Sequence, residues 1–206
     1  MKQNIIVALF DISSEAYQAF SELKAYSQTT DALVAQAVLI KKENGLIIPA
    51  ESTDFTANTA ESAWTGGLIG SLVGILGGPI GVLLGGAIGA LIGSDVGTAQ
   101  TLGEGSLLEN TAKKLDNGST AIIILAQESN EAVLDAFFHR FKTVILRQDV
   151  AVAQQDVLAA IEAQEEVARQ AHEAWKKQRK AERQEKVEAF KADIKQKFDK
   201  LAAKLK

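Results

Sequence analysis

The chain has 206 residues, of which 47% are hydrophobic and 23% charged, an ordinary globular composition for which disorder is not expected. It contains no cysteine, which excludes disulfides, thiolate catalysis and cysteine-ligated metals. The net charge of −4 is unevenly spread: residues 176–206 hold twelve Lys/Arg against five Asp/Glu, a net of +7, and residues 1–175 carry −11. We therefore expect a basic C-terminal segment with a partner of its own.

The first part of the chain has the pattern of a mixed domain. Residues 4–10 form an apolar run that is too short for a signal peptide and lacks a cleavage site, so we expect a buried strand. Ser13 or Ser14 can cap a helix that runs to about Tyr26. Strands follow at residues 33–41 and 46–49, joined by the hairpin signal Asn44-Gly45.

After a polar connection and a glycine-rich stretch, the pattern predicts a helix at 98–115 and a strand at 120–127. A helix capped by Ser129 or Asn130 and a strand at 143–147 come next, and the chain is helical from 151 to its end. The expected fold is α+β, with a ferredoxin-like β-α-β-β-α-β core, an inserted glycine-zipper helical hairpin and a long C-terminal helix. The expected domains are 1–61 with 96–150, the hairpin 62–95, and the tail 151–206.

The glycine-rich stretch is the most informative feature. Residues 62–94 carry no charged side chain. Each of the eleven glycines between positions 66 and 93 costs about 1 kcal/mol of helix propensity relative to alanine, so close packing between helices must offset the cost. Glycine recurs at every fourth position in two runs, which are the expected helix-packing residues: Gly66, Gly70, Gly74 and Gly78, then Gly81, Gly85, Gly89 and Gly93.

The turn of the hairpin is expected at Gly77, Gly78 and Pro79, because proline disfavours helical geometry at the residue before it. Each arm of about fourteen residues is roughly 21 Å long, shorter than the roughly 30 Å core of a bilayer. Three arrangements fit. The favoured one is a re-entrant or thinly spanning membrane hairpin; the others are a hairpin buried among copies of the chain and, least favoured, one buried in a monomer.

The opening strand, the hairpin from Trp64 to Gly93 and the strand entry from Gly118 to Leu125 carry a family resemblance. Across residues 4–148 the chain resembles bacterial predicted membrane proteins of unknown function in which a glycine-rich hydrophobic hairpin interrupts a ferredoxin-like domain. The resemblance implies membrane association and no established enzyme activity. The long basic tail after Val150 extends beyond the core of that family.

The tail predicts an amphipathic helix. Its apolar stripe matches an interfacial helix on an anionic leaflet; a coiled coil fits the spacing equally well, and the basic excess favours lipid. Nucleic acid is a disfavoured partner, because both aromatic residues of the basic segment lie on the apolar stripe. The expected lipid or assembly face is Val187, Phe190, Ile194, Phe198, Leu201 and Leu205, and the basic surface is Lys186, Lys191, Lys195, Lys197, Lys200 and Lys204.

No catalytic, cofactor-binding or metal-binding residue is expected. Neither His139 nor His172 has a second histidine at helical spacing. The sequence thus predicts a non-enzymatic, self-assembling protein at the cytoplasmic face of the cell membrane, with a role in scaffolding or remodelling the membrane under envelope stress. The alternatives are a soluble homo-oligomer that buries its glycine-zipper hairpins centrally and a ligand sensor that uses the ferredoxin-like domain.

Overall fold

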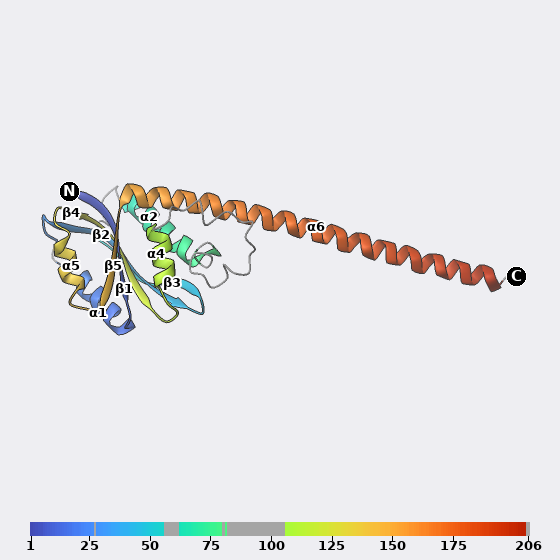
Figure 1. Cartoon of the computed structure of the whole chain (residues 1–206), viewed down its shortest axis with the longest axis horizontal. Helices are drawn as coiled ribbons and strands as arrows, with labels where there is room; N and C mark the ends of the chain where they lie inside the picture. The colour runs from blue at the N-terminus through green and yellow to red at the C-terminus, as the bar shows by residue number, and fades with distance from the viewer. Residues whose placement is uncertain (27, 56–61, 80, 82–105, 205–206) are drawn as a thin grey trace. The chain divides into compact units, whose positions relative to one another are not determined.

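The computed structural model describes residues 1–26, 28–55, 62–79, 81 and 106–204, with the backbone alone for 62–66, 181 and 193–204 (Figure 1). The chain divides into two compact units, Met1–Gln164 and Glu165–Lys206. The strands are β1 (Lys2–Phe10), β2 (Ala32–Glu43), β3 (Leu46–Asp54), β4 (Thr120–Glu128) and β5 (Thr143–Asp149). The helices of the described residues are α1 (Ser13–Lys24), α2 (Ser62–Gly77), α4 (Leu107–Lys114), α5 (Ala132–Phe138) and α6 (Val150–Lys204).

The five strands form one antiparallel sheet in the order β3-β2-β4-β1-β5. Strands β1 and β4 are the most apolar, and Ile6 lies opposite Ile124 on one side and Arg147 on the other. Both strands are buried along nearly their whole length. Near-continuous apolar runs are typical of strands that are covered on both faces.

Helices cover both faces of the sheet. Helices α1 and α5 lie on one face, and α2 and α4 lie on the other together with the first turns of α6 (Figure 1). Phe10, Phe20 and Phe138 fill the core under α1 and α5, where the rings of Phe10 and Phe138 pack edge to face with centroids 6.4 Å apart. The second core lies between the sheet and α2, α4 and α6.

Local signals explain the turns and caps. Asn44 and Gly45 both have positive φ, 53° and 80°, as a two-residue hairpin turn requires, so the predicted hairpin between β2 and β3 is confirmed. Helix α4 begins after Ser106, whose Oγ accepts a hydrogen bond from the Glu109 N–H at 3.1 Å. A serine followed three residues later by glutamate is a capping sequence, which the prediction of a helix over 98–115 overlooked.

The mixed α+β class is confirmed, but the finer arrangement is not. The expected ferredoxin-like order of the first six elements places β3 between β1 and β2. In the structure β4 occupies that position, and β3 lies at the edge of the sheet. Pro49 in β3 explains this placement physically, because proline cannot donate a ladder hydrogen bond and is tolerated at sheet edges.

The first part of α6 belongs to the core, although the expected domain division places residues 151–206 in a separate tail. Small residues at three- and four-residue spacing bring this helix close to the sheet face. Gln148 strengthens the junction, since its amide oxygen accepts from the Leu107 N–H at 2.8 Å and its amide nitrogen donates to Asp156 at 2.9 Å. The buried residues are Val150, Ala153, Val157, Ala160 and Ala163.

Candidate interaction surface

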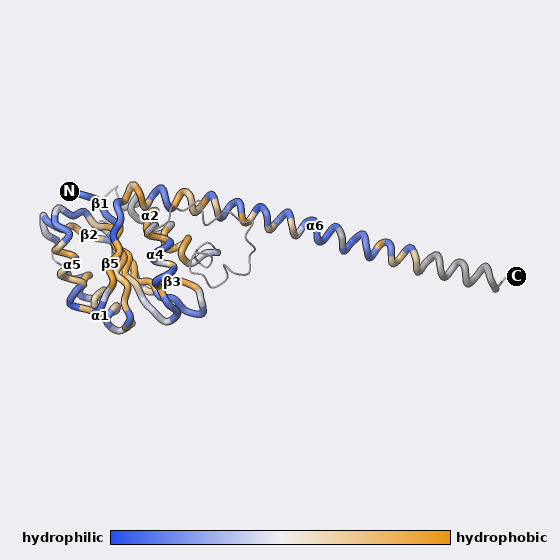
Figure 2. Tube along the Cα trace, viewed as in Figure 1, coloured by the Kyte–Doolittle hydropathy of each residue, from blue (hydrophilic) through white to orange (hydrophobic). Residues whose placement is uncertain are grey.

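Helix α2 is an uncharged helix with one face on the sheet. Its residues are apolar nearly all round, and Figure 2 shows it coloured largely as hydrophobic. One face packs on β2, β3 and β4 and on α4, so this part of the hairpin is buried against its own domain, the arrangement that the sequence favoured least. The side chains of that face are Leu68, Ile69, Leu72, Ile75 and Leu76, each at most 8% exposed.

The described residues leave the opposite face of α2 open. Gly67, Gly70 and Gly74 are exposed, and a methyl group added at any of them would meet none of the described atoms within 4 Å. Gly66 lies one turn before Gly70, so glycine follows this face at four-residue spacing. We call Gly66, Gly70 and Gly74 the glycine stripe. Packing within the described fold does not require glycine at Gly70 or Gly74.

The end of α2 is different, because there the backbones of two elements approach closely. A Cβ at Gly77 would lie 2.5 Å from the main-chain oxygen of Ile47 in β3, a distance that real Cβ atoms do not show. Gly77 is the last residue of α2, and the Gly78 N–H donates to the Ile75 oxygen at 3.1 Å. Glycine at position 77 therefore serves the docking of α2 on the sheet.

Most of the second glycine run lies outside the described residues, as does most of the rest of the predicted hairpin. Gly85, Gly89 and Gly93 lie outside the described residues, whereas Gly81 is described and buried. The side chain of Trp64, at the start of α2, is also outside the description. The packing of one glycine run on the other accordingly stays a prediction.

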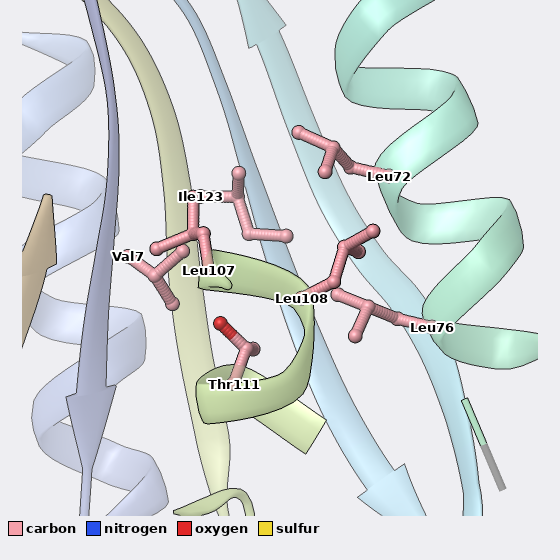
Figure 3. A pocket seen from close by; sticks show the side chains of 7 residues that line it. All are labelled: Val7, Leu72, Leu76, Leu107, Leu108, Thr111 and Ile123. Carbon is pink, nitrogen blue, oxygen red and sulfur yellow. The ribbon is translucent and has the colours of Figure 1, made fainter. Parts of the chain in front are cut away.

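A small cavity lies beneath α2. Leu72 and Leu76 of α2 face α4 and the sheet across it, and the only polar side chain in its lining is Thr111 (Figure 3). The cavity measures about 10 Å³, and the buried Thr111 Oγ1 has no hydrogen-bond partner among the described residues. This volume is about that of one water-sized probe, so the cavity does not accommodate an organic ligand.

The second unit is helical, and most of its described side chains are exposed. The Arg179 guanidinium carbon lies 4.0 Å from the centroid of the Trp175 ring. Arg169 donates a hydrogen bond to Glu166 at 2.5 Å. This bond, together with one from Gln170, holds the pKa of the Glu166 carboxyl below its ordinary value. Two residues of the predicted apolar stripe have described side chains, and both are exposed: Val187 (51%) and Phe190 (65%). Lys186 and Lys191 are exposed as well.

The remaining residues of that predicted surface have no described side chains, although the backbone is helical through Lys204. They are Ile194, Phe198, Leu201 and Leu205 of the apolar stripe and Lys195, Lys197, Lys200 and Lys204 of the basic surface.

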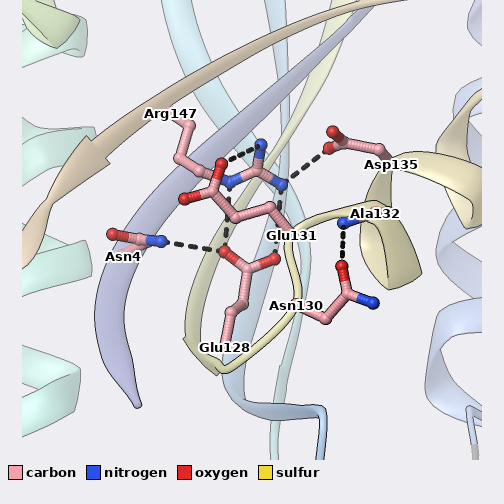
Figure 4. Close-up of polar contacts among 7 residues, drawn as sticks. All are labelled: Asn4, Glu128, Asn130, Glu131, Ala132, Asp135 and Arg147. Carbon is pink, nitrogen blue, oxygen red and sulfur yellow. Dashed lines mark hydrogen bonds and ion pairs between the residues drawn. The ribbon is translucent and has the colours of Figure 1, made fainter.

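Sequence reasoning missed one polar cluster (Figure 4). Glu128, at the end of β4, has a fully buried side chain and accepts from Arg147 through both carboxylate oxygens, at 3.0 and 3.2 Å. The same guanidinium donates to Asp135 at 2.6 Å and lies 3.6 Å from Glu131. Asn4 donates to Glu128 at 2.9 Å. The cluster joins β1, β4, β5 and α5.

The electrostatics of this cluster favour a permanent ion pair. Burial alone lowers the pKa of Arg147, but the hydrogen bond to Asp135 and the charge and hydrogen bonds of Glu128 outweigh it and raise the pKa. All polar atoms of the guanidinium face carboxylates, so the arrangement is that of a structural clamp. A bidentate arginine–carboxylate pair adds geometric specificity to the sheet register.

The described residues offer neither a metal-binding cluster nor a membrane-spanning helix. Among the residues that the structure describes, no group of three or more His, Asp or Glu side chains is arranged to hold a metal ion. His139 caps the end of α5 and His172 lies on α6, and both are exposed. Within the described part of the chain, no helix combines the length and the apolar character needed to cross a bilayer.

Comparison with known proteins identifies one region. A family model described as "Protein of unknown function (DUF1269)" matches residues 63–162, from α2 to the first turns of α6. No curated protein and no solved structure matches the chain. The match supports the predicted similarity to a family of unknown function; its description names neither a membrane nor a glycine motif. It omits β1 and β2, the two strands that flank β4 in the sheet.

Proposed function

We propose that the chain is a non-enzymatic, membrane-associated protein that assembles with copies of itself through the glycine stripe of α2. The open face of α2 carries this proposal. At Gly70 and Gly74 alanine would fit, and each glycine costs about 1 kcal/mol of helix stability relative to alanine. The packing of the described residues does not require glycine at these two positions. A second helix that approaches the backbone of α2 would explain why glycine is present there.

The partner helix that we propose is α2 of another copy. Two uncharged glycine stripes allow close contact between helix backbones, with van der Waals contacts and Cα–H hydrogen bonds. The leucine face of α2 remains on the sheet in this arrangement. Releasing α2 would uncover five buried aliphatic side chains and the sheet face beneath them, at a cost on the order of 10 kcal/mol. That cost is comparable with the whole stability of a domain.

Membrane contact is proposed for the end of α6. Val187 and Phe190 are exposed on a helix whose segment 176–206 carries a net charge of +7. An exposed apolar stripe flanked by lysines binds an anionic leaflet, and each near-surface Lys or Arg contributes about 1 kcal/mol. The cytoplasmic face of the cell membrane is the corresponding location, with scaffolding or remodelling of the membrane under envelope stress as the role.

We also propose that β1-α1-β2-β4-α5-β5 is a ferredoxin-like core. Its support is the antiparallel order β2-β4-β1-β5 with α1 and α5 on one face. In this arrangement β3, α2 and α4 belong to an insertion between the second and third core strands. The insertion begins one strand earlier than the sequence predicted.

A soluble homo-oligomer is the second candidate, and the docking of α2 on its own sheet favours it. Glycine stripes of several copies would then meet without lipid. The ligand-sensor alternative has no support from the cavity beneath α2, which is too small for an organic ligand.

Replacement of Gly70 and Gly74 by leucine tests the assembly proposal. A Cβ added at either position meets no described atom within 4 Å, so we expect the double variant to keep its circular dichroism spectrum and to lose the higher native mass in sedimentation velocity. The matched control is Ala136→Leu, which adds the same side chain at an exposed position of α5. An unchanged native mass in the double variant would remove the glycine stripe from the assembly.

Removal of residues 187–206 tests the membrane proposal. The full chain floats with phosphatidylcholine vesicles that contain phosphatidylglycerol, and the shortened chain does not. Vesicles of phosphatidylcholine alone are the control, because they lack the negative charge that the lysines bind. Equal flotation of both chains would reassign the tail to helix–helix assembly.

A further inference from the structure

The two edges of the sheet are built differently. At one edge, β3 contains Pro49, and its pairing with β2 has an irregular register between Leu39 and Ile40. Helix α2 packs over this strand, with Gly77 against the Ile47 carbonyl. A proline, a bulge and a covering helix are the devices by which proteins protect an edge from pairing with another chain.

The other edge, β5, contains neither a proline nor a bulge, although α4 and α5 contact the strand from the two faces of the sheet. Its seven residues contain no proline, glycine or lysine, and their register with β1 is regular from Thr143 to Asp149. Among the described residues β5 pairs only with β1, so every second residue directs its N–H and C=O away from the sheet. Val144 is 51% exposed on this strand.

Both charges of β5 are already engaged within the chain. Arg147 is held by Glu128 and Asp135, and Asp149 accepts from the Ala151 N–H at 2.8 Å at the start of α6. Arg147 is therefore not free to guard the edge, and Asp149 stands only at the end of the strand. An unguarded strand of this length is a template for the addition of another strand.

From these features we infer that β5 is a homodimer interface, in which β5 of a second copy pairs antiparallel and continues the sheet. A two-fold axis perpendicular to the sheet places the equivalent faces of the two sheets on the same side. Directly opposed residues are then both even-numbered or both odd-numbered. All seven residues pair only when Leu146 lies on the axis. Ile145 then faces the partner's Arg147, Val144 faces the partner's Gln148, and no like charges are opposed.

The ends of the strand favour a second copy over an unrelated strand. Lys142 precedes β5 and Asp149 ends it, so antiparallel self-pairing brings Lys142 next to the partner's Asp149 at both ends of the interface. The side chain of Lys142 is 78% exposed, although it also contacts Asp11 at 3.0 Å. This interface is separate from the glycine stripe, and neither proposal depends on the other.

Cysteine cross-linking of the full chain tests the interface, because the natural chain has no cysteine. On the axis, two Leu146→Cys residues have Cα atoms about 4.5–5.5 Å apart, within the range of a disulfide. Mild oxidation is expected to link them into a dimer. Two Val144→Cys residues would be about 14 Å apart, four residues along the strand, and are expected to stay unlinked.

The control is Ser52→Cys at the exposed opposite edge, where random collisions would link chains at least as readily. Adding Val144→Lys to Leu146→Cys is expected to lower the cross-linked fraction about tenfold, since two cross-strand pairs are lost per dimer. Leu146→Cys is expected to link equally well in the Gly70→Leu/Gly74→Leu chain, which separates this interface from the stripe. Equal linking of Leu146→Cys and Ser52→Cys, or none at Leu146→Cys, would overturn the inference.

Discussion

Replacing Gly70 and Gly74 by alanine should stabilise the isolated protein. Neither added methyl group meets a described atom within 4 Å, so the main effect is helix propensity, about 1 kcal/mol at each site and about 2 kcal/mol together. For a unit of 164 residues this corresponds to a rise in melting temperature of about 4–8 °C. Urea unfolding followed by circular dichroism, at a protein concentration low enough to exclude assembly, measures the change.

The matched control is Gly77→Ala in the same helix. Its Cβ would lie 2.5 Å from the Ile47 oxygen, so the backbones must move apart and about 1–3 kcal/mol should be lost. Leu72→Ala, on the buried face, should cost about 2–5 kcal/mol. If the Gly70/Gly74 double variant lost stability as Gly77→Ala does, the glycine stripe would be packed within the fold, and the argument for an outside partner would fail.

Three further predictions concern the rest of the first unit. Arg147→Leu leaves the buried Glu128 carboxylate without its cation and should cost about 3–5 kcal/mol in urea unfolding; a loss below about 1 kcal/mol would show that the clamp is dispensable. Ser106→Ala removes the cap of α4 and should cost about 1 kcal/mol, with Ser106→Thr as the conservative control; equal losses would contradict the capping role. Gly118 has a φ of +90°, which alanine adopts only with strain, so Gly118→Ala should cost about 1 kcal/mol of stability. The alanine changes at Gly70 and Gly74 should instead increase stability, and a gain in melting temperature for Gly118→Ala would refute this prediction.

Local patterns in the sequence predicted most of the elements of the first unit. The Asn44-Gly45 turn and the apolar strands β1 and β4 follow from rules that act over a few residues. The order of the strands depends on pairing between distant segments, which spacing alone does not specify. Pro49 nevertheless carried a usable signal, since it marks β3 as an edge strand and leaves the fully apolar β4 for the centre.

The candidate surface shows a similar division. Four-residue spacing correctly indicated that glycines 66, 70 and 74 lie on one face of a helix. It could not tell which face of α2 meets the sheet, because the helix is apolar nearly all round. The Arg147 cluster could not be predicted from the sequence for another reason. Glu128 and Arg147 meet only because β4 and β5 lie on either side of β1.

We propose that this protein associates with membranes through the end of α6 while its folded unit self-assembles. Fractionation at neutral pH of cells that express the full chain, beside the chain that lacks residues 187–206, tests it most directly. We expect the full chain in the membrane fraction and the shortened chain in the soluble fraction. Complete recovery of the full chain in the soluble fraction, as a defined large assembly without detergent, would contradict it.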